Sequence, residues 1–181
     1  MLPDTERRRL IAIARAAVTA AVTGRDVEAT RSGPTDPCPS ARGAFVTLKR
    51  QGQLRGCIGT LECREPLADE VARAAVSAAR EDPRFDPLRP EELDGLEVEI
   101  SVLGPLEAID PRDPIAIEIG RHGLVVEQGH RRGLLLPQVA TERAWGREQF
   151  LSQTCVKAGL PPDGWQRGAT VYRFEADVFG D

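Results

Sequence analysis

The sequence predicts an α+β fold: an antiparallel sheet with helices packed around it. Residues Leu96–Leu103 alternate apolar and polar side chains, which is typical of a strand with one buried face. Two other segments have the pattern of β-hairpins, and apolar residues near the N-terminus recur at helical spacing. Strands joined in hairpins, with helices grouped around them, argue against a doubly wound parallel sheet.

The first expected element is an amphipathic helix that begins at Asp4 or Thr5, either of which can cap it, and closes at Gly24. Its apolar face contains Leu10, Ala14, Ala17, Val18, Ala21 and Val22. Arginines at 7–9 before an apolar run resemble a secretion signal, but Arg15 interrupts that run. No stretch reaches the ~18 apolar residues of a membrane span. We therefore expect a cytoplasmic protein with no membrane association.

The first hairpin follows a loop from Arg31 to Pro39 that is rich in proline. Its strands are Ala44–Leu48 and a return strand from Leu54 towards Ile58, and Gln51-Gly52 has the composition of a hairpin turn. The return strand carries the most unusual local sequence of the chain.

A second helix is expected after Pro66 and ends near Glu81, because Pro83 disfavours helix at the residue before it. In the strand Leu96–Leu103, a solvated face explains Glu97 and Glu99 better than an acid pair does. The remaining expected elements are a hairpin with strands at 124–127 and 134–136 and a turn at 129–133, helices at 139–145 and 148–158, and a last strand at 169–178.

Composition limits the function classes. The chain has 181 residues, enough for one domain with room for a small lobe, and 41% of them are hydrophobic. Its 24 basic and 28 acidic residues give a net charge of −4, which disfavours nucleic-acid binding. Only Lys49 and Lys157 are lysines, and the other 22 basic residues are arginines, a bias that coding composition explains for most of them.

The cysteines do not form a metal-binding pattern. Cys38, Cys57, Cys63 and Cys155 are irregularly spaced, and none belongs to a pair with the two-to-four-residue spacing of zinc ligands. No glycine-rich phosphate loop, nucleophile elbow or zinc-protease helix is present either. We expect no metal and no cofactor.

The densest chemical signal is the segment Leu54–Thr60. Glycines 56 and 59 flank Cys57 and remove side chains where backbone amides could approach a ligand. Arg55 could stabilise a Cys57 thiolate if both side chains share a strand face, and Thr60 adds a hydroxyl. These residues suit anion binding, a reactive cysteine or both. The alternative is a buried cysteine on a core strand, with glycines at a bulge or bend.

A second signal is the rigid segment Asp82–Leu88, in which two prolines fix the backbone. Arg84 could grip a carboxylate or phosphate there, or it could tie Asp82 or Asp86 to the scaffold. We expect Phe85 to be a core anchor.

Three other positions have both a functional and a structural explanation. His122, between glycines, could act as a base for Cys57, although a surface histidine in a turn is commoner. Gln138 could contact a ligand or satisfy the start of a helix. Lys157 suits the last turn of a helix.

Taken in order, these segments resemble the AMME-chromosomal-region domain family, also called AmmeMemoRadiSam system protein A. The resemblance covers essentially the whole chain as a single domain, residues 1–181, and Arg55–Gly59 is its most specific segment. The matching segments are Arg42–Leu48, Leu54–Thr60, Asp82–Phe85, Ile100–Leu103, Gly133–Val139, Trp145, Phe150-Leu151, Cys155 and Lys157–Pro161.

The resemblance implies two unequal lobes forming a cleft, with signature residues gathered there. It also implies a Memo-like protein and a radical-SAM enzyme as partners, without implying a reaction. The signature residues in this chain are Arg55, Cys57, Gly59, Thr60, Arg84 and Gln138. Many relatives carry aspartate at the position of His122, which weakens a Cys57–His122 pair.

Three functions follow as expectations. The first is an accessory protein that binds a small anionic ligand or a protein partner through Arg55, Gly56, Gly59, Thr60, Arg84 and Gln138. The second is an enzyme with Cys57 as its catalytic nucleophile. The third, a nucleic-acid-binding regulator, rests only on the arginine content.

Overall fold

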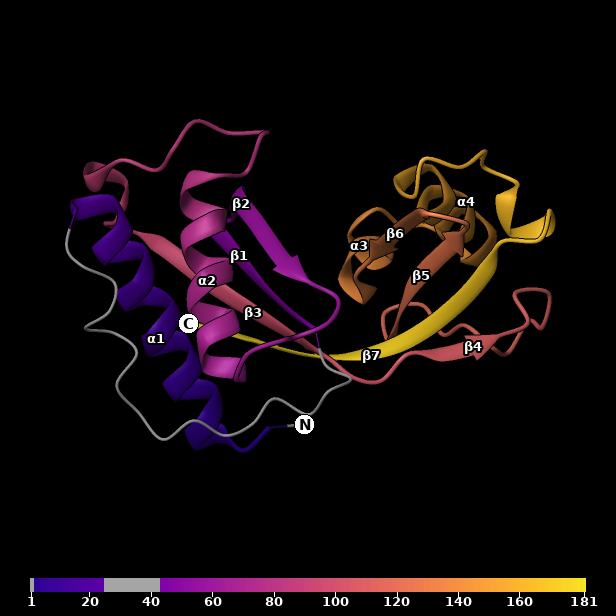
Figure 1. Cartoon of the computed structure of the whole chain (residues 1–181), viewed down its shortest axis with the longest axis horizontal. Helices are drawn as coiled ribbons and strands as arrows, with labels where there is room; N and C mark the ends of the chain where they lie inside the picture. The colour runs from indigo at the N-terminus through magenta and orange to yellow at the C-terminus, as the bar shows by residue number, and fades with distance from the viewer. Residues whose placement is uncertain (1, 25–42) are drawn as a thin grey trace. The chain divides into compact units, whose positions relative to one another are not determined.

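A computed structural model describes residues 2–24 and 43–181 of the chain. The chain divides into two compact units, one made of residues 1–103 with 177–181 and the other of residues 104–176 (Figure 1). The predicted loop Arg31–Pro39 and Cys38 lie outside the described residues. Helices and an antiparallel sheet confirm the α+β prediction. Whether the chain forms a single domain with a cleft depends on how the two units are placed, and this expectation stays a prediction.

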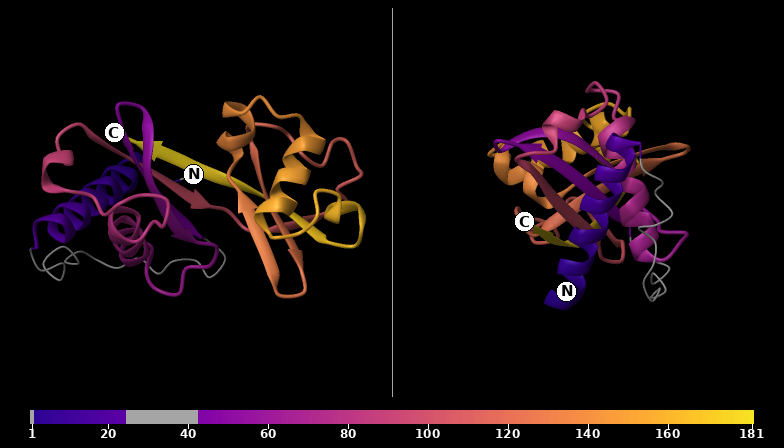
Figure 2. Two further views of the ribbon diagram at one scale, coloured as in Figure 1. Left: turned by 90° about the horizontal axis from the view of Figure 1, so that it is seen from above. Right: turned by 90° about the vertical axis from the view of Figure 1, so that its left-hand side faces the viewer.

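The first unit contains an antiparallel sheet with two helices on one of its faces (Figure 2). The elements of this unit are α1 (Asp4–Thr23), β1 (Ala44–Arg50), β2 (Gln53–Thr60), α2 (Leu67–Arg80), the 3₁₀ turn η2 (Pro90–Glu92) and β3 (Leu96–Leu103). Strand β1 pairs with β2 on one side and with β3 on the other.

The core of this unit lies between the sheet and its two helices. Val46 and Leu48 of β1 and Val98 and Ile100 of β3 are at most 1% exposed on the helix-facing side. Helix α2 presents mainly alanines to them, so its backbone can lie close to the sheet. The alternating pattern of β3 therefore identified the buried face correctly.

Three local expectations for this unit are wrong. Helix α1 is preceded by Pro3 as N-cap, with no side-chain cap from Asp4 or Thr5, whereas Gly24 does close it at φ 77°. Phe85 is half-buried beside two arginines and is not a core anchor. The second face of β3 is solvated only at its start, because Ser101 is 1% exposed.

The elements of the second unit are β4 (Glu107–Ile109), β5 (His122–Gln128), β6 (Arg131–Leu135), α3 (Pro137–Glu142), α4 (Arg147–Lys157), η3 (Gly164–Gln166) and β7 (Thr170–Gly180), whose last residues belong to the first unit. In its sheet, β5 lies between β6 and β7, and β4 pairs with β7. Its core includes Phe150 and Leu151 packed against Leu124, Val126 and Val171.

The hairpin of this unit is tighter than expected. Residues Arg131–Gly133 pair with β5 instead of forming part of the turn, which leaves Gly129-His130 at the tip. The short strand β4 was not predicted. Within residues 2–24 and 43–181, no helix has the length and apolar character required to cross a bilayer.

Candidate functional site

Cys57 owes its position to a β-bulge in the first hairpin. The turn residues Gln51 and Gly52 both have positive φ, 53° and 73°, as a two-residue hairpin turn requires. The register then shifts by one residue between Leu48 and Lys49, so that Cys57 pairs with Thr47. Cys57 consequently points away from the helices, on the same face of the sheet as Thr47.

The Cys57 thiol is held in its protonated form. Burial raises its pKa above the ordinary value, while the Thr47 hydroxyl and the positive charge of Arg84 partly oppose this effect. The Thr47 hydroxyl donates to Sγ at 3.3 Å. A thiol with a raised pKa is a weak nucleophile at neutral pH, because the thiolate is the reactive species.

Asp82 organises the site from the first residues after α2. Its side chain is only 2% exposed. Oδ2 accepts the backbone N–H of Cys57 at 2.8 Å, and the Arg84 guanidinium donates to Oδ1 at 2.9 Å and to Oδ2 at 2.7 Å. These hydrogen bonds hold the pKa of Asp82 far below its usual range, with Arg84 as the main cause. Asp82 is therefore an anionic anchor for both the strand and the arginine.

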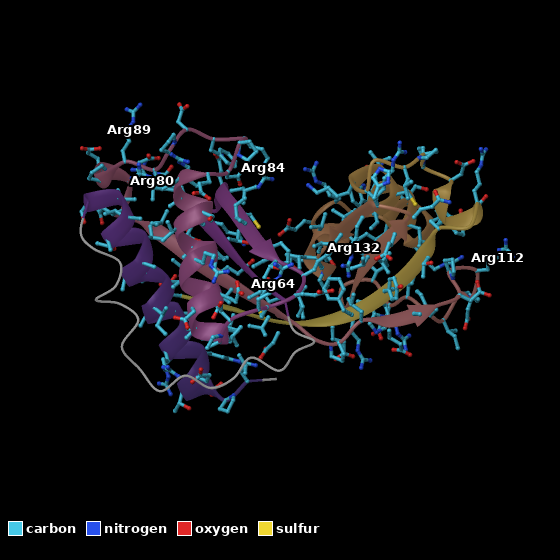
Figure 3. The ribbon with its side chains drawn as sticks, in the orientation of Figure 1. Arg64, Arg80, Arg84, Arg89, Arg112 and Arg132 are labelled. Atoms are coloured by element: carbon cyan, nitrogen blue, oxygen red, sulfur yellow. The ribbon has the colours of Figure 1, made fainter. Side chains whose placement is uncertain are left out.

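Arg84 faces solvent from this anchor. Figure 3 shows it on the loop that follows α2, and its side chain is 51% exposed. Nε and Nη2 serve Asp82, and Nη2 also lies 3.4 Å from the carbonyl oxygen of Cys57. Among the described residues, Nη1 has no hydrogen-bond partner. The prediction that Arg84 ties Asp82 to the scaffold is confirmed, and two guanidinium N–H donors remain for a ligand.

Arg55 has a different partner from the one that the sequence suggested. Its guanidinium donates to both carboxylate oxygens of Glu92, at 2.8 and 3.0 Å. This pair holds the pKa of Glu92 at about 2 and fastens η2 to the start of β2. The Phe85 ring lies close to two guanidinium groups. Its centroid is 5.9 Å from Cζ of Arg55 and 5.5 Å from Cζ of Arg84. Arg84, not Arg55, is the cation that acts on the Cys57 thiol.

The two glycines of the signature permit close packing. A Cβ at position 56 would overlap the carbonyl oxygen of Ala78 in α2, and one at position 59 would overlap the Phe45 ring. Thr60 uses its hydroxyl locally, donating to the carbonyl oxygen of Glu62 at 2.9 Å. Ligand contacts by Arg55, the glycines and Thr60 stay predictions.

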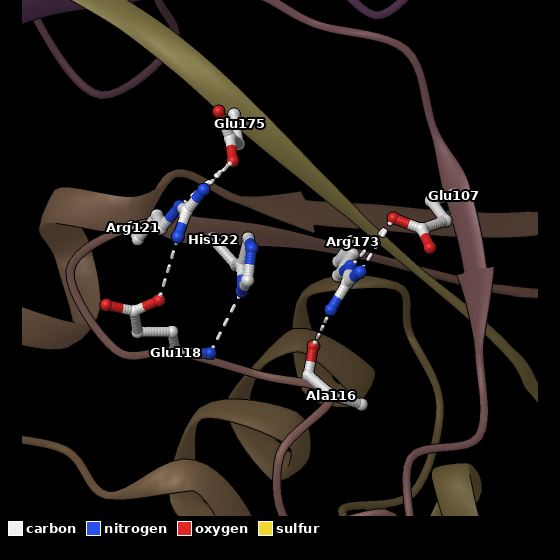
Figure 4. Close-up of polar contacts among 7 residues, drawn as sticks. All are labelled: Glu107, Ala116, Glu118, Arg121, His122, Arg173 and Glu175. Atoms are coloured by element: carbon white, nitrogen blue, oxygen red, sulfur yellow. Dashed lines mark hydrogen bonds and ion pairs between the residues drawn. The ribbon is translucent and has the colours of Figure 1, made fainter.

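Gln138 and His122 belong to the second unit. The Oε1 atom of Gln138, in the first turn of α3, is buried and has no hydrogen-bond partner among the residues that the structure describes, so it does not satisfy the helix start. His122 Nδ1 accepts the backbone N–H of Glu118 at 2.9 Å (Figure 4). Burial and nearby arginines lower its pKa, so the ring is neutral with its proton on Nε2.

The contacts around His122 give it a structural role. Arg173 donates to the carbonyl oxygen of Ala116 at 2.8 Å and pairs with Glu107, while Arg121 pairs with Glu175 (Figure 4). Together they fasten the loop before β5 to the sheet of the second unit. A base role toward Cys57 stays untested, because the two residues lie in different units.

Sequence reasoning missed Thr47 and Glu92 and did not recognise Asp82 as the centre of the site. Asp82 stood in the singled-out segment, but the acceptor of the Cys57 N–H is set by tertiary packing. Among residues 2–24 and 43–181, no cluster of histidine, cysteine and acidic residues is arranged to hold a metal ion.

Comparison with known proteins identifies the family of the chain. The AMMECR1 family matches residues 11–179. The chain belongs to the AMMECR1 family. A protein of Methanothermobacter thermautotrophicus is 50% identical over 183 residues, covering 98% of this chain and 95% of its own. One from Methanosarcina acetivorans is 45% identical over 185 residues, covering 99% and 93%.

The AMMECR1 assignment also holds at the level of structure. The crystal structure of the uncharacterised protein PH0010 from Pyrococcus horikoshii is 43% identical in sequence and superimposes with a TM-score of 0.83. The match covers 95% of this chain and 89% of that one.

Proposed function

We propose that this AMMECR1 protein is a cytosolic accessory protein that binds a small anionic ligand, or a carboxylate of a protein partner, beside Cys57. The observation that carries the proposal is the Asp82–Arg84 pair. A buried carboxylate fixes the guanidinium by two hydrogen bonds, the side chain is half-exposed, and Nη1 has no hydrogen-bond partner among the described residues. A guanidinium held in one orientation loses little entropy when it binds an anion.

The same geometry disfavours the alternative of an enzyme with a Cys57 nucleophile. Burial raises the thiol pKa, and the immediate partner of the thiol is a hydroxyl that donates to sulfur instead of a base. The acidic net charge of −4 disfavours a nucleic-acid-binding regulator.

Titration with acetate and with phosphate, followed by NMR of the ¹⁵N-labelled full chain, tests the anion site. We expect Arg84→Gln to weaken binding about ten- to a hundredfold, the range for losing a charged hydrogen bond. Arg73→Gln is the matched control, because Arg73 is 54% exposed and also pairs with a buried carboxylate, Glu70. Equal affinities for Arg84→Gln and the wild type would contradict the proposal.

A link to a Memo-like protein and a radical-SAM enzyme is part of the proposal and rests on the family resemblance alone. Co-purification and crosslinking with those two proteins test it. Contact that is lost in Arg84→Gln and kept in Arg73→Gln would connect the partner to the anion site. Absence of any contact would remove the partners from the proposal.

A further inference from the structure

Strand β2 lies at the end of the sheet of the first unit. Within the part of the chain that the structure describes, β2 pairs only with β1 and stands at the end of the strand order. In an antiparallel ladder, every second residue of such a strand directs its N–H and C=O groups away from its neighbour. These outward groups are unpaired unless something else meets them.

At Cys57 side chains take the place of the missing strand. Its N–H donates to Asp82 Oδ2 at 2.8 Å, and its carbonyl oxygen lies 3.4 Å from Arg84 Nη2. Both backbone groups of Cys57 therefore point outward, and the alternation of the ladder gives Gly59 the same orientation.

Within the described part of the chain, Gly59 has no such substitute partner. Among residues 2–24 and 43–181, no side chain or loop backbone is hydrogen-bonded to its N–H or C=O group. It lies about 7 Å along the strand from Cys57, at about 3.4 Å per residue. On the face of the sheet that Cys57 shares, the Phe45 ring covers it, so only its backbone edge is available.

We infer that an extended peptide segment of a partner protein adds to the edge of β2 at Gly59, antiparallel to it, and ends with its C-terminal carboxylate on Arg84 Nη1. One peptide residue exchanges two hydrogen bonds with Gly59, as strand addition requires. A chain that runs from Gly59 towards Cys57 is antiparallel to β2, and it arrives at the guanidinium with its C-terminus. The positive charge at that end selects a free carboxylate.

This inference rests on the proposed anion site and adds the class of partner. Asp82 and Arg84 block pairing at Cys57, so the added strand cannot continue past it. The end of the peptide is therefore expected at this position, which explains why a cation stands there.

The test uses the ¹⁵N-labelled full chain and a pool of hexapeptides rich in valine and threonine with free C-termini. We expect the Gly59 amide to exchange with solvent at least tenfold more slowly when the pool is present. An amidated pool should bind about ten- to a hundredfold more weakly, because a charged hydrogen bond is lost. A pool N-methylated at its last three residues should give no protection of Gly59.

The variants separate this inference from the proposed function. Arg84→Gln should bind the free and amidated pools equally, while Arg73→Gln should keep the difference. If acetate binds but no pool slows Gly59 exchange, the strand-addition inference is wrong and the anion site stands. If neither acetate, phosphate nor peptide binds, the proposed function itself is wrong.

Discussion

Asp82 accepts the backbone N–H of Cys57 at 2.8 Å through the same carboxylate that fixes Arg84. One buried side chain thereby joins the edge of β2 to the loop after α2. The sulfur, the guanidinium and the strand edge keep a fixed relation because they share this anchor.

Asp82→Ala should lower the free energy of unfolding by about 2–4 kcal/mol, because it leaves a backbone N–H and a guanidinium without their partner. Urea unfolding measures the change. Asp4→Ala is the control, since the side chain of Asp4 is 83% exposed and its pair with Arg7 spans 3.6 Å. Similar, small losses for both variants would contradict the role given to Asp82.

Gly56→Ala should lower the free energy of unfolding by about 1–3 kcal/mol, because the new methyl group overlaps the Ala78 carbonyl oxygen and pushes α2 from the sheet. Gly146→Ala provides the comparison, since no atom of the described residues lies within 4 Å of a Cβ at this N-cap of α4. Its cost should stay under about 1 kcal/mol, typical of a change at a helix cap. Thermal and urea unfolding of the two variants measure both losses of stability, and equal losses would contradict the close packing of Gly56 on α2.

Stability should depend on pH through Glu92. The hydrogen bond from Arg55 is the main cause that lowers its folded pKa to about 2, against the ordinary 4.5, and burial partly opposes this shift. Because the folded pKa is depressed, the pair contributes fully above pH 4.5 and its contribution is lost as pH falls towards 2.

Urea unfolding of the wild type and Glu92→Gln between pH 6 and pH 2 measures this contribution. The difference in the free energy of unfolding between the two proteins should be constant near pH 6 and should shrink as the pH approaches 2. A difference that does not change with pH would show that Arg55 does not stabilise the Glu92 carboxylate.

Cys57 should react slowly with iodoacetamide at pH 7.5 compared with cysteine in an unfolded peptide, because burial raises its pKa. Thr47→Val and Arg84→Gln should slow it further, since both side chains favour the thiolate. Peptide mass spectrometry distinguishes Cys57 from the other cysteines. Alkylation as fast as in the peptide would revive the nucleophile hypothesis.

Most elements followed from short-range signals. The alternation of Leu96–Leu103 gave β3 its observed bounds, and Gly24 and Pro66 marked the end of α1 and the beginning of α2. The predicted cap of α1 and the predicted length of the turn at 129–133 were wrong, because several neighbouring residues were each suited to serve as the cap or as part of the turn. Long-range partners such as Glu92 for Arg55 had no sequence signal at all.

The sequence by itself determined the α+β class, the order of the elements and the segments in which chemistry is concentrated. Only tertiary structure decided which face those residues occupy. Counting from the turn Gln51-Gly52 without a bulge pairs Cys57 with Val46 on the buried, helix-facing side. The observed bulge pairs it with Thr47 and turns Gly56 to α2 instead. A strand repeats every two residues, so a shift of one residue reverses every side chain, and packing against α2 selects the register.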